Sequence, residues 1–203
     1  MVGESRDKET VSMGVEASLT GHLVFSTLHT NSAPESITRL LDMGMDPFNF
    51  ADALLGILAQ RLAKRLCACK EAYEPTPDEM QAFVSEYAQE LLHTPAWQAN
   101  PAQAAERQLA DWTQQHGQSG TLKLYRATGC ETCRGTGYKG RLGLHELLVA
   151  EDTTRKLIQE RARVADLFIA CITGGMRTLK MDGMEKVLMG LTDLKQVRAV
   201  CVK

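Results

Sequence analysis

Two close pairs of cysteines constrain how this chain can fold. Cys67 and Cys69 form the first pair, and Cys130 and Cys133 form the second, far along the sequence. Four thiolates make the closed ligand set of a structural zinc site, and one shared ion would hold the two segments together. The glycines that follow the second pair let the chain turn tightly beneath such an ion. We therefore expect zinc on these four residues.

Other interpretations of the cysteines remain open. Cys67 and Cys69 could be buried thiols at a helix end, with the second pair in a plain glycine-rich turn. A dithiol redox role is weaker, because no thioredoxin-like βαβ unit precedes Cys130. The C-x-x-C-x-G-x-G pattern also resembles one repeat of the cysteine-rich region of J-domain chaperones, which carry several copies. Cys171 and Cys201 stand alone on apolar helical stretches, where we expect them in the core.

The composition excludes several classes of protein. The formal net charge of −2 leaves no general footprint for nucleic acid or a membrane surface, and 5% aromatic residues argue against base stacking. No apolar run approaches the roughly 18 residues of a membrane span, and no signal peptide is visible. Six cysteines without export signals indicate a reducing cytosol. We expect a cytoplasmic protein that binds no nucleic acid, which disfavours a zinc-ribbon nucleic-acid binder.

The first part of the chain predicts an α/β arrangement. Residues 1–4 look like the end of a strand, 9–18 like a helix, and 23–28 like a strand buried on both faces. Asn31 or Ser32 can cap the next helix, which Gly44 would stop. A long helix is then expected from Asp46-Pro47 to Leu66, because apolar residues recur on one helical face at 51, 54, 55, 58, 62 and 66.

The remainder reads as mainly helical. Residues 71–121 predict a helical insertion, in which Thr76 and Glu79 form a capping box and Asn100-Pro101 opens a second helix. Residues 122–125 predict a short strand. The tail over 153–202 predicts helices broken at Gly174-Gly175, Gly183 and Gly190. This divides the chain into 1–66, a subdomain over 67–145, and a C-terminal helical region over 146–203.

Two residues near the start suggest phosphate chemistry. Glu4 ends one predicted strand and His29 ends the next, while His22 opens that second strand. Phosphate-handling α/β enzymes place metal and γ-phosphate contacts at such strand ends. Taken singly, a surface acid and a structural histidine are the commoner explanations. No G-x-x-x-x-G-K-[ST] phosphate loop occurs in the 203 residues.

Taken together, the motifs resemble those of one family. MVGESRDKET resembles the Walker B region, and TGHLVFSTLHT the histidine box, of the secretion ATPases that drive type II secretion and type IV pilus assembly. AQRLAKRLCACK and CETCRGTGYKGRLGLHELL resemble the halves of their tetracysteine motif. GMRTLKMDGMEKVLMGLTDLKQV resembles their C-terminal helical region. The resemblance covers nearly all of the chain outside 71–121 and is closest to the E-type members.

The resemblance implies a fold and a set of roles. It implies an α/β fold, with a partial P-loop (RecA-like) ATPase core followed by a zinc-binding subdomain and a C-terminal helical region. Glu4 matches the Walker B glutamate, which is expected near Mg²⁺ and ATP. His29 matches the histidine that is expected to sense the γ-phosphate, and His22 supports the same histidine box. Cys67, Cys69, Cys130 and Cys133 match the zinc ligands. The partners implied are a homo-hexamer and an inner-membrane platform protein, at the cytoplasmic side of that membrane.

The chain departs from the family pattern in three respects. The Walker A loop, aspartate box and N-terminal domain are missing, so we expect a C-terminal portion that binds no ATP alone, with an apolar surface exposed around Val24 and Phe25. The first cysteine pair is C-x-C rather than C-x-x-C. The long spacer between the pairs is expected to loop out, because loop length adds little closure cost. The alternative function is a non-enzymatic zinc module that binds the parent hexamer or the platform protein.

Overall fold

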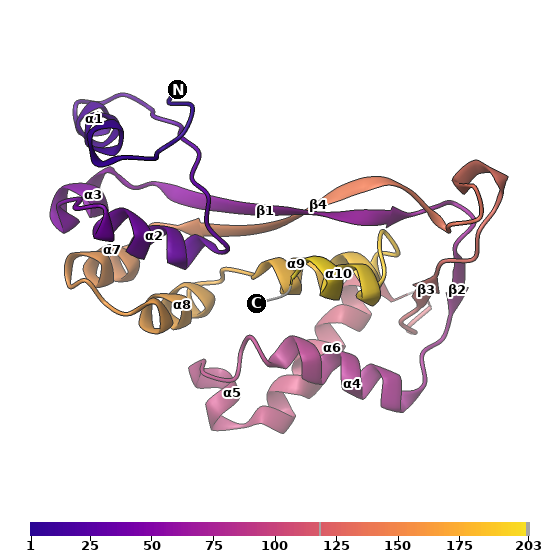
Figure 1. Ribbon diagram of the computed structural model, residues 1–203. Coiled ribbons are helices and arrows are strands. Elements are labelled where there is room, and N and C mark those ends of the chain that lie inside the picture. The colour runs from indigo at the N-terminus through magenta and orange to yellow at the C-terminus, as the bar shows by residue number, and fades with distance from the viewer. Residues whose placement is uncertain (118, 202–203) are drawn as a thin grey trace. The chain divides into compact units, whose positions relative to one another are not determined.

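The computed structural model describes residues 1–117 and 119–201, and these divide into two units (Figure 1). Unit one comprises Met1–Ala59 and Glu146–Met176, and unit two comprises Gln60–His145 and Arg177–Lys203. Strands β1 (Gly56–Leu66) and β4 (Tyr138–Val149) pair in a two-stranded sheet and contribute residues to both units. No helix in the described part of the chain is long and apolar enough to cross a membrane.

Unit one contains five helices within the described residues, and their starts follow from local capping. These are α1 (Lys8–Leu19), α2 (Ala33–Asp42), α3 (Pro47–Ala53), α7 (Asp152–Gln159) and α8 (Val164–Thr173). Ser32 accepts a hydrogen bond from the Glu35 N–H, and Asp46 accepts one from the Asn49 N–H. Each side chain satisfies an N–H that the helix itself leaves free. The predicted starts of α2 and α3 are confirmed.

The long helix expected up to Leu66 is wrong. Helix α3 ends at Ala53, and the following residues form β1 instead. Leucines at positions 58, 62 and 66 are spaced by four, a spacing that fits one face of a strand as well as one face of a helix. Pairing with β4 decides between them. At Gly56 an added Cβ would lie 2.8 Å from the Leu148 carbonyl oxygen, so glycine permits the close approach of the strands.

The strand expected over 23–28, buried on both faces, is also wrong. This described segment has no regular strand, and Leu23 and Phe25 are 65% and 63% exposed. It runs beside the first residues of the chain through hydrogen bonds from Val2 N to Phe25 O and from Ser5 N to Thr27 O, both 2.8 Å. Because only the first residues of the chain lie beside this segment, its apolar side chains stay uncovered. The exposed apolar surface is confirmed at Phe25, whereas Val24 is half-buried.

Unit two combines short strands with helices. Its helices are α4 (Pro77–Ala88), α5 (Pro95–Ala99), α6 (Pro101–His116), the 3-10 turn η1 (Glu131–Cys133), α9 (Leu179–Leu188) and α10 (Leu194–Val200). Strands β2 (Glu71–Tyr73) and β3 (Leu124–Arg126) pair antiparallel, with Ala72 opposite Tyr125. The helical insertion and the Thr76–Glu79 capping box are confirmed, and Asn100 caps α6 as predicted.

Helix α9 is the centre of the unit-two core. On one side its Leu179 packs with Ala63 of β1 and Leu144 of β4. Gly183 lies inside α9, so the helix break expected there is wrong. An added Cβ at Gly183 would lie 2.7 Å from Val197 Cγ1, and glycine therefore permits close packing against α10. The breaks expected at Gly174-Gly175 and Gly190 are confirmed.

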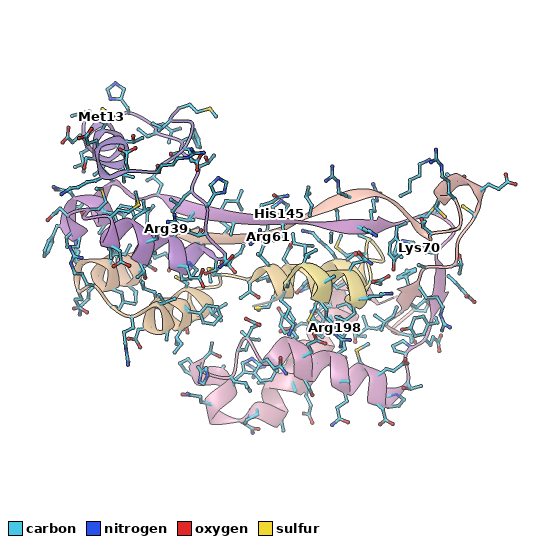
Figure 2. All side chains as sticks on the ribbon, viewed as in Figure 1. Met13, Arg39, Arg61, Lys70, His145 and Arg198 are labelled. Atoms are coloured by element: carbon cyan, nitrogen blue, oxygen red, sulfur yellow. The ribbon has the colours of Figure 1, made fainter. Side chains whose placement is uncertain are left out.

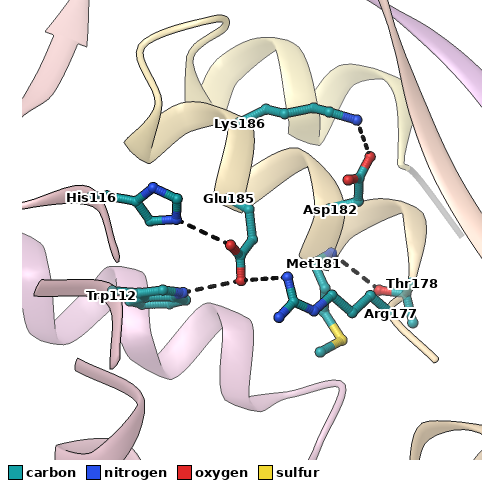
Figure 3. Close-up of polar contacts among 8 residues, drawn as sticks. All are labelled: Trp112, His116, Arg177, Thr178, Met181, Asp182, Glu185 and Lys186. Atoms are coloured by element: carbon teal, nitrogen blue, oxygen red, sulfur yellow. Dashed lines mark hydrogen bonds and ion pairs between the residues drawn. The ribbon is translucent and has the colours of Figure 1, made fainter. Parts of the chain in front are cut away.

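The other side of α9 holds the insertion (Figure 3). Trp112 of α6 is fully buried, and its ring meets those of Phe83 and Tyr87 edge-on. Its Nε1–H donates to Glu185 Oε1 on α9 at 3.2 Å, and His116 Nε2 lies 3.2 Å from Glu185 Oε2. Arg177 Nη1 also lies 3.0 Å from Oε1 of this buried carboxylate. The insertion is thus packed into the core of unit two.

Candidate functional site

The four cysteines of unit two form one cluster. Their sulfur atoms all lie within 4.8 Å of one another. The Cys67–Cys130 and Cys69–Cys133 Sγ distances are 3.9 Å, and the Cys130–Cys133 distance is 3.7 Å. A tetrahedral site with Zn–S bonds of about 2.3 Å has sulfur–sulfur edges of about 3.8 Å. The cluster therefore fits a single metal ion, and the C-x-C spacing of the first pair is compatible with it.

Backbone geometry fixes the second pair. The N–H groups of Cys130 and Gly137 donate to Cys133 Sγ at 3.1 and 3.2 Å. Gly137 adopts a φ of 76°, and an added Cβ there would lie 2.5 Å from the Ala127 Cβ. The Gly137 carbonyl in turn accepts a hydrogen bond from Cys67 N at 2.9 Å, which joins the two cysteine segments. Gly137 thus permits the tight turn and also hydrogen-bonds to both cysteine segments.

The same N–H donors favour thiolates. Burial raises the pKa of the Cys133 thiol, but the hydrogen bonds from Cys130 and Gly137 outweigh it and lower that pKa to about 6. A hydrogen bond from the Cys133 backbone lowers the pKa of Cys130. At Cys67 an N–H from Cys69 acts in the same direction, yet burial and the neighbouring thiols raise its pKa overall. Thiolate is the form of cysteine that binds metal, so the lowered pKa values of Cys130 and Cys133 favour binding of a cation by the second pair.

In unit one, the structure brings Glu4 and His29 together. His29 Nε2 lies 3.1 Å from Glu4 Oε1, and Arg6 pairs with the other carboxylate oxygen at 2.5 Å. The hydrogen bond from Arg6 lowers the pKa of Glu4, burial opposes this, and the charges of Arg6 and His29 add to the lowering. Arg39 of α2 holds the histidine segment by donating to the His29 carbonyl at 2.8 Å (Figure 2). His29 itself is 83% exposed, and an exposed imidazole beside an ionised carboxylate can meet a ligand.

His22 has a different environment. Its Nδ1 lies 3.2 Å from the Ala17 carbonyl oxygen and 3.4 Å from Thr20 Oγ1, at the C-terminal end of α1. The imidazole is exposed and contacts the last turn of that helix. In this structure His22 therefore closes α1, whereas Glu4 and His29 face each other.

Glu146 is a residue of the site region that the sequence did not reveal. It lies on β4, is 3% exposed, and accepts a hydrogen bond from Ala33 N at 2.7 Å at the start of α2. A buried carboxylate at a helix N-terminus compensates the helix dipole. Glu146 thereby fixes the helix that follows the histidine segment. The available signal was an acid between Leu144 and Leu148 in an alternating pattern.

Sequence comparison identifies the relatives. Residues 1–199 match the family described as "Type II/IV secretion system protein". The chain is 42% identical over 201 residues to the type IV pilus assembly ATPase PilB of Thermus thermophilus, covering 98% of this chain and 19% of that protein. It is 41% identical over 203 residues to the type II secretion system ATPase E of Vibrio cholerae, covering 98% of this chain and 34% of that one. The chain thus spans about a fifth to a third of these relatives' lengths.

Solved structures agree at the level of the fold. The pilus retraction motor PilT with bound ADP superposes with a TM-score of 0.55 at 21% identity, covering 98% of this chain and 39% of that chain. The Legionella pneumophila ATPase DotB gives 0.54 at 18% identity, with 98% and 37% covered. The predicted fold class, an α/β fold like part of these ATPases, is confirmed. The match over nearly the whole sequence shows that this chain belongs to the type II/IV secretion system protein family.

Proposed function

We propose that this chain supplies one side of the ATP site of a secretion or pilus-assembly ATPase, together with a structural zinc centre. The observation that carries the proposal is the 3.1 Å approach of His29 Nε2 to Glu4 Oε1, within the segment matched to the family. The complete protein would hydrolyse ATP as a homo-hexamer and act on an inner-membrane platform protein from the cytoplasmic side.

Each residue of the pair has a distinct task in this proposal. A glutamate is ionised at neutral pH, and the hydrogen bond from Arg6 lowers the pKa of Glu4 further. Its carboxylate can therefore accept a hydrogen bond from a water molecule. The exposed His29 imidazole can reach a γ-phosphate oxygen, and His22 would support the same segment from the end of α1. Mg²⁺ bound with ATP would neutralise charge on the phosphates.

Zinc on Cys67, Cys69, Cys130 and Cys133 would be structural. The four sulfur atoms supply a complete tetrahedral set and leave no open position for a substrate. An ion there would tie the end of β1 to the start of β4. We propose zinc because four cysteine thiolates closed around a single ion are the usual ligand set of a structural zinc site.

The test is a chimera. The 203 residues contain no phosphate loop, so this segment replaces the matching portion of Thermus thermophilus PilB, which provides the rest of the protein. We expect the chimera to hydrolyse ATP and Glu4→Gln to reduce turnover by about 100-fold or more. Glu16→Gln, an exposed carboxamide change on α1, is the matched control. Equal turnover in the two variants would contradict the role of Glu4.

A non-enzymatic zinc module is the second candidate. The observation that favours it is that all four cysteine sulfur atoms of the candidate metal site come from this chain and lie within 4.8 Å of one another. Such a module would bind the platform protein or the parent hexamer with equal affinity in the presence and absence of ATP. Nucleotide-independent binding, together with an inactive but folded chimera, would favour this function over ATP hydrolysis.

A further inference from the structure

The turn between α9 and α10, residues 190–193, contacts both segments of unit two that carry the cysteines. Each of its four residues makes a hydrogen bond to one of those segments. Gly190 builds the turn, because its φ of 67° lies in the left-handed region. Gly190 N donates to Val187 O and Leu191 N to Lys186 O, both at 2.9 Å. These two bonds end α9 and define where the turn begins.

Two contacts to the turn come from the strand that leads into the first cysteine pair. Leu66 N donates to the Leu191 carbonyl at 2.9 Å, immediately before Cys67. Thr192 is fully buried, and its Oγ1 donates to the Lys64 carbonyl at 2.8 Å. Both bonds involve main-chain atoms at the end of β1, so the turn fixes the backbone that positions Cys67.

A third contact comes from Lys70, directly after Cys69, at the end of the ribbon (Figure 2). Its Nζ donates to the Gly190 carbonyl and lies 4.5 Å from the centre of the Tyr125 ring. An added Cβ at Gly190 would lie 2.6 Å from Tyr125 Cε2 and 2.8 Å from Lys70 Nζ. Glycine in the turn therefore permits the close approach of this lysine and its aromatic neighbour.

The fourth contact reaches the second cysteine segment. The carbonyl of Gly137 accepts the hydrogen bond from Cys67 N, and Tyr138 is the next residue. The Tyr138 hydroxyl donates to Asp193 Oδ2 at 2.5 Å. The other carboxylate oxygen of Asp193 accepts a hydrogen bond from the Gln196 N–H at 2.9 Å and so caps α10. Asp193 thus connects the start of α10 to the chain just after the second cysteine pair.

We propose that the turn over residues 190–193 holds the two cysteine segments in the positions that the metal needs, so that metal affinity and the order of the turn are coupled. The turn and the ion would join the same two segments. Segments that are already held together lose less conformational freedom when the ion binds, which raises the affinity. By linkage, the ion stabilises the turn in return. The inference rests on the zinc centre of the proposed function and adds Lys70 and Tyr138 to it as positioning residues.

Competition with a chromogenic chelator, at fixed pH and under reducing conditions, measures the affinity of the 203-residue chain for Zn²⁺. Lys70→Met with Tyr138→Phe removes two of the four contacts and leaves every cysteine in place. We expect the affinity to fall about tenfold or more, because contacts outside the ligand shell change metal affinity by about 10–100-fold. Lys139→Met with Tyr73→Phe makes the same two side-chain changes outside the four contacts. This matched control should bind Zn²⁺ like the original chain.

Gly190→Ala tests the coupling from the side of the turn. The added Cβ would collide with the Tyr125 ring and the Lys70 ammonium, so the affinity for Zn²⁺ should fall here as well. Gly175→Ala is the control, because Gly175 also has a positive φ, 101°, but no atom lies within 4 Å of an added Cβ. It introduces the backbone strain without the collision and should leave the affinity unchanged.

Hydrogen exchange of the original chain tests the reverse direction without any substitution. Zn²⁺ should slow exchange at the Gly190 and Leu191 amides more than in α4, which contributes no residue to the four contacts. Equal Zn²⁺ affinity in the turn variants and their controls, or protection no greater at these amides than in α4, would overturn the coupling and leave the zinc centre intact. A chain that takes up no Zn²⁺ would instead remove the zinc centre of the proposed function, and this inference with it.

Discussion

Replacing Glu185 with alanine should destabilise unit two by about 3 kcal/mol. The carboxylate is 8% exposed and has three partners: Trp112, His116 and Arg177. A hydrogen bond to a charged group contributes about 1.5–3 kcal/mol, and a buried donor left without a partner costs about 1–3 kcal/mol. Trp112 is fully buried and would lose its hydrogen-bond acceptor. Arg177 is 52% exposed and can hydrogen-bond to water instead, so it contributes little to the loss of stability.

Urea unfolding followed by tryptophan fluorescence measures this effect, because Trp97 and Trp112 both lie in the insertion. Glu160→Ala is the matched control: its carboxylate is 57% exposed and sits 4.0 Å from Lys156, so its loss should change the free energy of unfolding by less than about 0.5 kcal/mol. Combining Glu185→Ala with Trp112→Phe should cost less than the sum of the two changes. A Glu185→Ala protein as stable as the Glu160→Ala control would refute this account of the core.

Three further predictions address the metal, the charge pair and the core. Cys130→Ser should lower the metal content from one ion per chain to none by elemental analysis; a folded original chain without metal would contradict the zinc centre. Arg198 lowers the pKa of Glu86, so the pair stabilises the protein fully above pH 4.5 and loses this effect as pH falls through the lowered folded-state pKa. The stability difference between Arg198→Met and the original chain should therefore vanish in acid, and a pH-independent difference would exclude this linkage. Gly183→Ala should reduce the free energy of unfolding by about 1–3 kcal/mol through overpacking against Val197; unchanged thermal stability would argue against close packing there.

Features that depend on neighbouring residues could be predicted from the sequence. The Thr76–Glu79 capping box and the Asn100 cap each involve groups three positions apart, so the pattern contains all the partners. The clustering of the cysteines was also predictable, because a shared ligand set implies proximity.

Features that depend on distant partners could not be predicted in this way. The leucine spacing of β1 fits a helix as well as a strand, and the partner that decides between them, β4, lies far along the chain. Glu146 and Glu185 look like surface acids in the sequence, yet both are buried in the structure. Glu146 accepts a hydrogen bond from Ala33 N, and Glu185 accepts one from Trp112 Nε1.

The most direct test of the central claim is the coupling between Glu4 and His29 in ATP turnover by the PilB chimera. If both residues serve the same ATP site, Glu4→Gln and His29→Ala should each lower kcat strongly while ATP still binds. The double variant should then be little worse than the slower single variant, because residues that act as a unit are not additive. If the losses in kcat of the two single variants multiply in the double variant, or if neither substitution changes turnover, the account is contradicted.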